Sequence, residues 1–442
     1  MKPFTLTALA ARIRSGELSP VELVEHCLAR IDRLEDRLHA WVLVNRDGAR
    51  AAARRATEAV ARGRALGPLH GIPIGIKDII DVAGWPTLAG SRVRGNRAAE
   101  YDAPLVAQLR AAGAIFLGKT VTTEFACFDP PPTRNPWNLG RTPGGSSSGS
   151  AAAVAVEMCV AAIGSQTGGS ITRPATFCGV AGLKPTFGCV SLEGLVPVSP
   201  RLDHPGPIGR SAADLGVLLR VIAMPGAQLA AGARLTRPPR IGWLKDFFVS
   251  EASPPVRAAT QTAVEQLRSS GATIEPVGLP PSFARVHEMH LRIMASDAAA
   301  YHRSTFDSQP DLYGRHISQL IRTGEKVAPA AYAEAVEHQQ TFRREMQTLA
   351  AAYDGLLAPA TVTPAPTPET TGDPRFNSPW SFAGLPVVSI PCSLADDGLP
   401  CGLQFIGPPN ADLALVELAA WCEAKLGFQV EPAEQRAVSR GQ

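Results

Sequence analysis

The hydrophobic positions near the start of the chain repeat with a helical period. Ser19-Pro20 with Glu22 predicts a helix that begins with a capping box. Apolar residues then recur at helical spacing, at Val24, Cys27, Leu28, Ile31 and Leu34. A following stretch rich in Ala and Arg predicts another helix up to about Leu66. The chain up to about residue 65 is therefore expected to be helical.

The period then changes from helical to alternating. Isoleucines at every second position before Lys77 predict a strand over residues 71–77. Asp102 is expected to cap a helix that ends at Gly113, and residues 114–118 predict the next strand. A helix followed by a strand is the pattern of an α/β fold.

The rest of the chain continues this alternation. The pattern predicts a helix near 151–158, a strand near 160–163, a helix over 211–223, a strand over 240–247, a mostly helical stretch over 282–353, a loop over 361–374, strands over 385–391 and 402–406, and a helix to about Leu426. No internal repeat is found. We expect one α/β domain over residues 1–442, with N-terminal helices (1–66), a core (67–225), a mainly helical cover (226–360) and a return to the core sheet (361–442).

Composition and charge narrow the class of protein. Apolar residues make up 45% of the 442 residues, charged residues make up 19%, and the net charge is +3. No stripe of Lys and Arg is interleaved with aromatic residues, so nucleic acid and anionic membrane are not expected partners. No run of apolar residues is long enough to span a membrane, and the eight cysteines are dispersed. We expect a cytoplasmic protein with reduced thiols.

Two loops combine glycine with serine. Residues 143–150 contain Ser146 and fit a flexible turn equally well, because Gly/Ser runs are common linkers. The second loop, Thr167-Gly168-Gly169-Ser170, carries more information. Paired glycines let a substrate carbonyl approach the backbone, where successive N–H groups can bind an oxyanion beside a serine nucleophile.

A serine hydroxyl needs a base that takes its proton. None of the nine histidines lies near either loop in the sequence. A lysine serves if burial keeps it neutral, and Lys77 stands at the end of the alternating strand in a mostly apolar context. The local sequence alone also fits a lysine on the polar face of a strand.

Four motifs taken together resemble those of the amidase signature family. They are Gly75-Ile76-Lys77-Asp78, Gly144-Gly145-Ser146-Ser147-Ser148-Gly149-Ser150, Gln166-Thr167-Gly168-Gly169-Ser170 and Cys178-Gly179-Val180-Ala181-Gly182-Leu183-Lys184-Pro185-Thr186. Their order and spacing match, with 69 residues from Lys77 to Ser146 and 24 from there to Ser170. Asp203–Pro207 and Gly402–Pro408 resemble further blocks of the family. The resemblance covers nearly the whole chain and is weakest at 230–350.

The resemblance implies a fold and a chemistry. The fold would be a central mixed, twisted β-sheet covered by helices on both faces. Ser170 would be the acylated nucleophile, and Ser146, usually preceded by a cis peptide in the family, would link it to the base Lys77. The backbone of Thr167, Gly168, Gly169 and Ser170 would hold the oxyanion. The expected activity is hydrolysis of a small-molecule amide to a carboxylate and ammonia or an amine, with no cofactor and no metal. Homodimers are frequent in the family.

The chain departs from many family members beside the nucleophile. Gln166 stands where many have Asp, and Thr172 stands where many have Arg, while Arg173 follows one position later. This resembles the malonamidase-like subgroup, which takes small amides that carry a carboxylate. A guanidinium binds a carboxylate in bidentate fashion, so Arg173 is a candidate for substrate recognition. A structural ion pair with a nearby Asp or Glu is the equal alternative.

Other signals are weaker, and rival functions stay open. His287 and His290 share a helical face but have no third ligand at a recognisable spacing, so structural histidines are favoured over a metal site. Cys178 is expected to be a buried packing residue. The same catalytic set would serve the amide-hydrolysing subunit of a tRNA-dependent amidotransferase. A scaffold with a degenerate site is the third alternative, and the competent residues at all three catalytic positions disfavour it.

Overall fold

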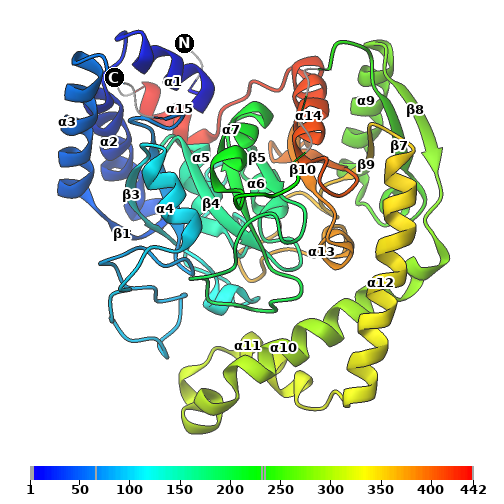
Figure 1. Ribbon diagram of the computed structural model, residues 1–442. Helices are drawn as coiled ribbons and strands as arrows, with labels where there is room; N and C mark the ends of the chain where they lie inside the picture. Colours follow the sequence, from blue (N-terminus) through cyan, green and yellow to red (C-terminus); the bar gives the residue numbers. More distant parts are fainter. Residues whose placement is uncertain (1–3, 65–66, 230–231, 233–234, 441–442) are drawn as a thin grey trace.

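The computed structural model describes residues 4–64, 67–229, 232 and 235–440. Within these residues eleven strands form one mixed sheet (Figure 1). In spatial order the strands are β1 (Trp41–Val44), β3 (Ile115–Thr120), β2 (Pro73–Lys77), β4 (Ala161–Gln166), β6 (His204–Gly209), β5 (Ala181–Lys184), β10 (Val387–Leu394), β11 (Pro400–Ile406), β9 (Gly355–Pro359), β7 (Arg240–Leu244) and β8 (Thr273–Val277). The pairs β2–β3, β2–β4, β7–β8 and β7–β9 are parallel, and the others are antiparallel. The predicted α/β fold with a central mixed sheet is therefore confirmed.

Helices pack along this sheet, and the predicted alternation is largely present. The α-helices are α1 (Leu6–Arg14), α2 (Pro20–Leu38), α3 (Arg46–Ala61), α4 (Pro104–Ala111), α5 (Ser148–Ala155), α6 (Thr172–Phe177), α7 (Ala212–Ile222), α8 (Asp246–Ser250), α9 (Pro254–Ser269), α10 (Val286–Ser308), α11 (Arg315–Gly324), α12 (Pro329–Ala351), α13 (Ser378–Ala383), α14 (Asp412–Leu426) and α15 (Ala433–Arg440). Short 3₁₀ turns lie at η1 (Glu124–Ala126), η2 (Pro281–Arg285) and η3 (Pro310–Leu312). Figure 1 shows α10, α11 and α12 together at the lower right, beside the sheet.

Local sequence explains the best-predicted elements. Ser19 caps α2 through the backbone of Glu22, whose side chain bonds back to Ser19, as the capping box predicts. All five residues of β2 are buried, including Ile74 and Ile76. A strand inside a mixed sheet is covered on both faces, so β2 needs no polar face. This removes the alternative of a solvated Lys77 on a polar strand face.

Three expectations about the first part of the chain need correction or lie outside the structure. Residues 41–44, expected to be helical, form the edge strand β1, which pairs with β3. Asp102 does not cap α4, because its carboxylate accepts from the backbone N–H of Ala83 and from Arg110, and Ala103 precedes the helix. The expected helix end at Leu66, like the outer limits at residues 1 and 442, lies outside the described residues.

Two strand ends place the candidate residues together. β2 ends at Lys77, and its parallel neighbour β4 ends at Gln166, directly before the second Gly/Ser loop. Parallel neighbours bring their carboxyl ends to the same edge of a sheet. Ser146 lies in the loop before α5, and Ser170 lies in the loop between β4 and α6. The three candidate residues therefore come from three different segments of the chain.

All eight cysteines are free and buried, which agrees with dispersed, reduced thiols. Cys178 is fully buried and its thiol faces the carbonyl oxygen of Pro143, as expected of a packing residue. Among the helices in the described part of the chain, none combines the length and apolar character that crossing a bilayer requires.

Candidate active site

Lys77 is fully buried at the end of β2, and its amine has hydroxyl partners. Nζ lies 2.6 Å from Ser146 Oγ, 2.8 Å from Ser165 Oγ and 3.5 Å from the carbonyl oxygen of Ser165. Ser165 comes from β4, the parallel neighbour of β2. The amine is thus aimed at the Gly/Ser loop that contains Ser146.

Burial favours a neutral Lys77. Removal of the ammonium from water lowers its pKa well below the usual lysine value, and the nearby Asp203 and Cys127 oppose this only in part. The adjacent carboxylate, Asp78, does not restore the charge, because it pairs with the buried Lys119 at 2.9 Å. Lys77 is therefore a buried amine without an ion-pair partner in the described chain, as a base requires.

The loop before α5 holds Ser146 in place. The Gly145–Ser146 peptide is cis, as the family resemblance implies. The carbonyl oxygen of Ser146 accepts from the N–H of Thr123 at 3.4 Å. The next residue, Ser147, donates its N–H to the carbonyl oxygen of Ser170 at 3.2 Å and thereby joins the two serine loops.

The second loop is shaped by Gln166. Its side-chain oxygen accepts from the backbone N–H groups of Ile171 and Thr172, both at 3.0 Å, and from the hydroxyl of Thr172 at 3.1 Å. Gln166 thus bridges the loop from its start to the first turn of α6. In the described structure, no acceptor is found for the backbone N–H groups of Gly168, Gly169 and Ser170. These donors suit an oxyanion.

Two side chains contact Thr167. Its hydroxyl donates to Asp203 at 2.5 Å, and the other oxygen of Asp203 accepts from the N–H groups of Val198 and Ser199. The ring of His290 lies 3.0 Å from the carbonyl oxygen of Thr167. Burial lowers the pKa of His290 to about 4, so the ring is neutral near pH 7 and donates to that carbonyl. Burial raises the pKa of Asp203 to about 6.

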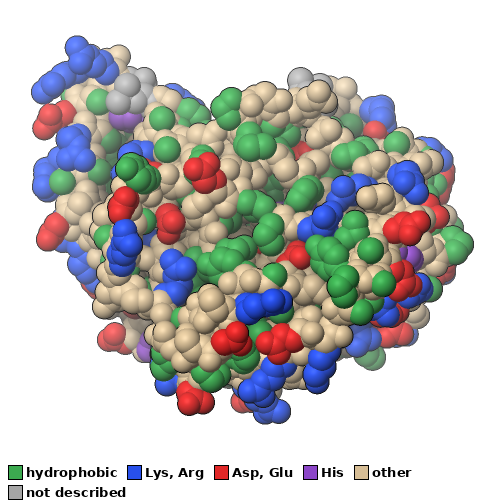
Figure 2. All heavy atoms as spheres, turned by 60° about the horizontal axis from the view of Figure 1, so that its bottom comes forward, with side chains coloured by type: hydrophobic (Ala, Val, Ile, Leu, Met, Phe, Trp, Pro, Cys, Tyr) green, Lys and Arg blue, Asp and Glu red, His purple; other side chains and the backbone are tan. Residues whose placement is uncertain are grey.

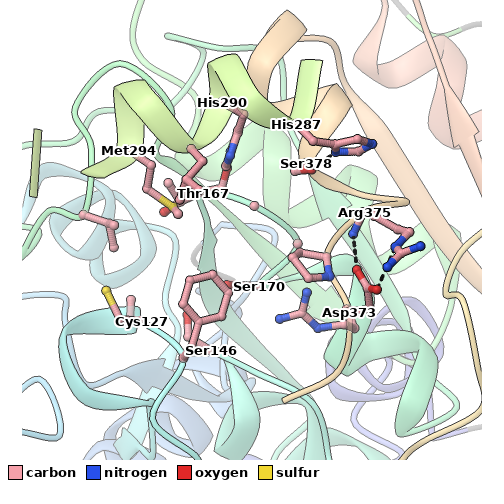
Figure 3. A pocket seen from close by; sticks show the side chains of 18 of the residues that line it. Cys127, Ser146, Thr167, Ser170, His287, His290, Met294, Asp373, Arg375 and Ser378 are labelled. Atoms are coloured by element: carbon pink, nitrogen blue, oxygen red, sulfur yellow. Dashed lines mark hydrogen bonds and ion pairs between the residues drawn. The ribbon is translucent and has the colours of Figure 1, made fainter. Parts of the chain in front are cut away.

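A cavity of about 410 Å³ opens onto these residues. Ser146, Ser170 and the backbone of 167–169 line it, together with residues 126–128, α10 and the segment 373–378 (Figure 3). Of these elements, α10 belongs to the stretch 282–353 that the sequence predicts to be mostly helical. Figure 2 shows basic and acidic side chains interspersed around the edge of one face, with hydrophobic side chains nearer its centre.

Arg173 lies on α6, is 2% exposed and lines the cavity. Nε donates to the carbonyl oxygen of Thr371 and Nη2 to that of Gly145, both at 2.8 Å. Nη1 is buried without a hydrogen-bond partner. Gly169 leaves room for it, since a Cβ there would lie 2.9 Å from Nη1. The structural ion pair considered for Arg173 is not found within the described residues.

Several residues of the site escaped sequence reasoning. Ser165 lies in β4, one residue before its end, without any motif signal, and its contact with Lys77 depends on the pairing of β2 with β4. The sequence favours structural roles for His287 and His290, and both line the cavity. Asp373 and Arg375 also line it, paired with each other at 2.7 Å. Only the helical spacing of the two histidines was visible in the sequence.

The comparisons with known proteins agree on one family of amide-hydrolysing proteins. The sequence model described as amidase matches residues 22–416. The A subunit of the glutamyl-tRNA(Gln) amidotransferase from Chloroflexus aggregans is 36% identical, over 94% of this chain and 94% of that protein. A crystal structure of an amidase matches with a TM-score of 0.88 and 32% identity, over 96% of this chain and 100% of that one. Native peptide amidase from Stenotrophomonas maltophilia matches with a TM-score of 0.81 and 31% identity, over 97% and 99% of the two chains.

Proposed function

Because the chain belongs to the amidase family and is a hydrolase of amide C–N bonds, we propose that Ser170 is its nucleophile and Lys77 its base, linked by Ser146. The observation that carries this proposal is the buried amine of Lys77, 2.6 Å from Ser146 Oγ. A lysine can act as a general base only when it is neutral and within hydrogen-bond reach of the proton that it takes. Lys77 has both properties toward Ser146.

The reaction runs as an acyl transfer. Lys77 accepts a proton from Ser146, which takes one from Ser170 as the Ser170 oxygen attacks the amide carbon. The N–H groups of Gly168, Gly169 and Ser170 stabilise the oxyanion. The C–N bond then breaks, and the nitrogen leaves with the proton that returns through Ser146. Water hydrolyses the ester by the same relay and gives a carboxylate and free Ser170.

The pH dependence follows from Lys77. A protonated Lys77 cannot accept a proton, so kcat/KM is expected to be low in acid and to rise with pH through the Lys77 pKa. Because burial lowers that pKa, the plateau should be reached well below about 10.4, the usual lysine value. The measurement is kcat/KM against pH from 4 to 10.

Asp203→Asn identifies which group titrates in that profile. The negative charge of Asp203 raises the pKa of Lys77, so its removal should move the rise to lower pH. If the rise came from Asp203 itself, whose pKa is about 6, the variant would abolish it. A rise that stays at the same pH in Asp203→Asn would count against Lys77 as the titrating group.

We further propose that the substrate carries a carboxylate. The support is Arg173, which lines the cavity and whose Nη1 is buried without a partner, while its other nitrogens donate to Thr371 and Gly145. Burying an unsatisfied charged donor is costly, and an anionic ligand removes that cost. Burial already lowers the pKa of Arg173 to about 10, which still leaves it charged near pH 7.

Arg173→Ala is expected to lower kcat/KM for a carboxylated amide by about 10–100-fold relative to a neutral amide of equal size. Arg375→Ala is the matched control, because Arg375 also lines the cavity but is paired with Asp373 and Glu251. That control should change the ratio much less. An unchanged preference in Arg173→Ala would count against carboxylate recognition.

The curated relatives support a second candidate function. They are A subunits of a glutamyl-tRNA(Gln) amidotransferase, and they support the amidotransferase alternative more strongly than a stand-alone amidase. Glutamine is itself a small amide with a carboxylate, so Arg173 suits either function. The stand-alone alternative is supported by the mainly apolar cavity and by the solved amidase structures.

Ammonia and amine release by the purified chain separates the two candidates. A stand-alone amidase, which we expect to elute as a homodimer, would hydrolyse several carboxylated amides unaided. An amidotransferase subunit would hydrolyse no amide other than glutamine, and it would do so only in the presence of a partner subunit. A scaffold with a degenerate site would release nothing from any amide.

A further inference from the structure

The cavity is larger than a small primary amide requires. Its volume of about 410 Å³ lies within the roughly 300–1,000 Å³ of pockets that hold drug-sized ligands. The exposed surface of the whole cavity is mainly apolar. Binding of an apolar group there would remove apolar surface from water, which is favourable.

The two sides of the cavity differ in chemistry. Figure 3 shows Cys127 and Met294 on one side of Ser170, with Asp373 and Arg375 on the other. Burial raises the pKa of the Cys127 thiol, so it stays neutral and behaves as an apolar group. Phe128 and Val198 also line the cavity. One side therefore suits hydrocarbon and the other a charged group.

The apolar side lies next to Ser146. The N–H of Thr123 donates to the carbonyl oxygen of Ser146, and the chain then turns sharply. Phe125 and Ala126 both have left-handed backbones, with φ of 47° and 56°, which non-glycine residues seldom adopt. The turn brings Cys127 into the cavity, near Lys77.

Ser146 returns the proton to the leaving nitrogen in the proposed function, on which this inference rests. A substituent on that nitrogen would therefore lie beside Ser146 and contact the apolar side of the cavity. We propose that the substrate is a secondary amide whose nitrogen carries an apolar alkyl or aryl group, bound over Cys127, Phe128 and Met294. The acyl half carries the carboxylate toward Arg173. Hydrolysis consumes one water and gives a dicarboxylate and an apolar primary amine.

Two substrate series locate the apolar group. The first series is succinamic acid with hydrogen, methyl, butyl, hexyl or phenyl on the nitrogen. The second is a set of unsubstituted monoamides of dicarboxylic acids whose acyl part carries the same groups. In the N-substituted series we expect kcat/KM to rise by about fourfold per added methylene until the apolar side of the cavity is filled. In the acyl-substituted series we expect no such rise. A rise of kcat/KM with chain length that occurs only in the acyl-substituted series would overturn the proposal. So would a primary amide that is the best substrate.

Met294→Ala tests the surface itself. It should lower the kcat/KM ratio of the N-hexyl to the N-methyl substrate by about tenfold. Leu291→Ala, a change at a cavity residue that is 45% exposed and so carries little risk for folding, should lower the ratio by less but in the same direction. Met224→Ala is the matched control, since Met224 is 40% exposed and does not line the cavity. An unchanged ratio in Met294→Ala and Leu291→Ala would contradict the proposed contact.

The two levels of the proposal fail in different ways. If no amide is hydrolysed at all, the proposed function fails. If unsubstituted carboxylated amides are hydrolysed through Ser170 without any gain from an N-alkyl group, the proposed function stands and this inference is wrong.

Discussion

Lys77→Ala is expected to lower kcat/KM by at least about 10³-fold while the protein stays folded. The amine is the only basic nitrogen within reach of Ser146 in the described site, and no other contact supplies the missing proton acceptor. Water that enters the space would be a far weaker base. Steady-state kinetics on a carboxylated amide give the loss, and circular dichroism with thermal unfolding reports the fold.

Two companion variants separate chemistry from packing. Lys77→Met keeps most of the buried volume but removes the amine, so it should lose as much activity as Lys77→Ala. Lys184→Met changes another fully buried lysine, whose pKa burial lowers to about 7 and which does not line the cavity. It should keep activity per folded molecule within a few-fold. Retained turnover in Lys77→Met would rule Lys77 out as the base.

Ser170→Ala is expected to be the most damaging single change, with a loss of about 10⁴–10⁶-fold in kcat. Without Oγ no acyl-enzyme can form, and only binding and the oxyanion donors of the loop remain. The change removes one atom from a residue that is 8% exposed, so little stability should be lost.

The double variant Lys77→Ala/Ser170→Ala gives a check on the relay. Residues that act as one unit show strongly non-additive losses. The double variant should therefore be no slower than Ser170→Ala alone. Losses that multiply would indicate that the two residues act in separate steps.

The sequence predicted the parts of the site that local pattern and motif order control. The isoleucine alternation before Lys77 predicted β2, and the capping box at Ser19 predicted α2. Lys77 and the Ser146 loop each also allowed a simpler explanation, and only their order and spacing with Ser170 pointed to catalysis. The edge strand β1 was missed because its four residues lie between two long helices and show no clear alternation.

Contacts between distant segments lay beyond sequence reasoning. Ser165 contacts Lys77 because β2 and β4 are parallel neighbours. The sequence of a strand does not show which other strand it pairs with. His290 reaches Thr167 across 123 residues of sequence. The free Nη1 of Arg173 depends on Gly145 and Thr371, which occupy its other nitrogens. The sequence places Arg173 three residues after the nucleophile. Only the fold shows that its Nη1 has no partner and that Arg173 does not form an ion pair within the described residues.

Peptide mapping after reaction with a sulfonyl fluoride identifies the nucleophile itself. The wild-type chain should carry one label, on Ser170, and its rate of labelling should rise with pH as Lys77 loses its proton. Lys77→Met should label far more slowly. A label on Cys127 or on another residue, or no label on Ser170 in active protein, would contradict a Ser170 nucleophile activated by Lys77.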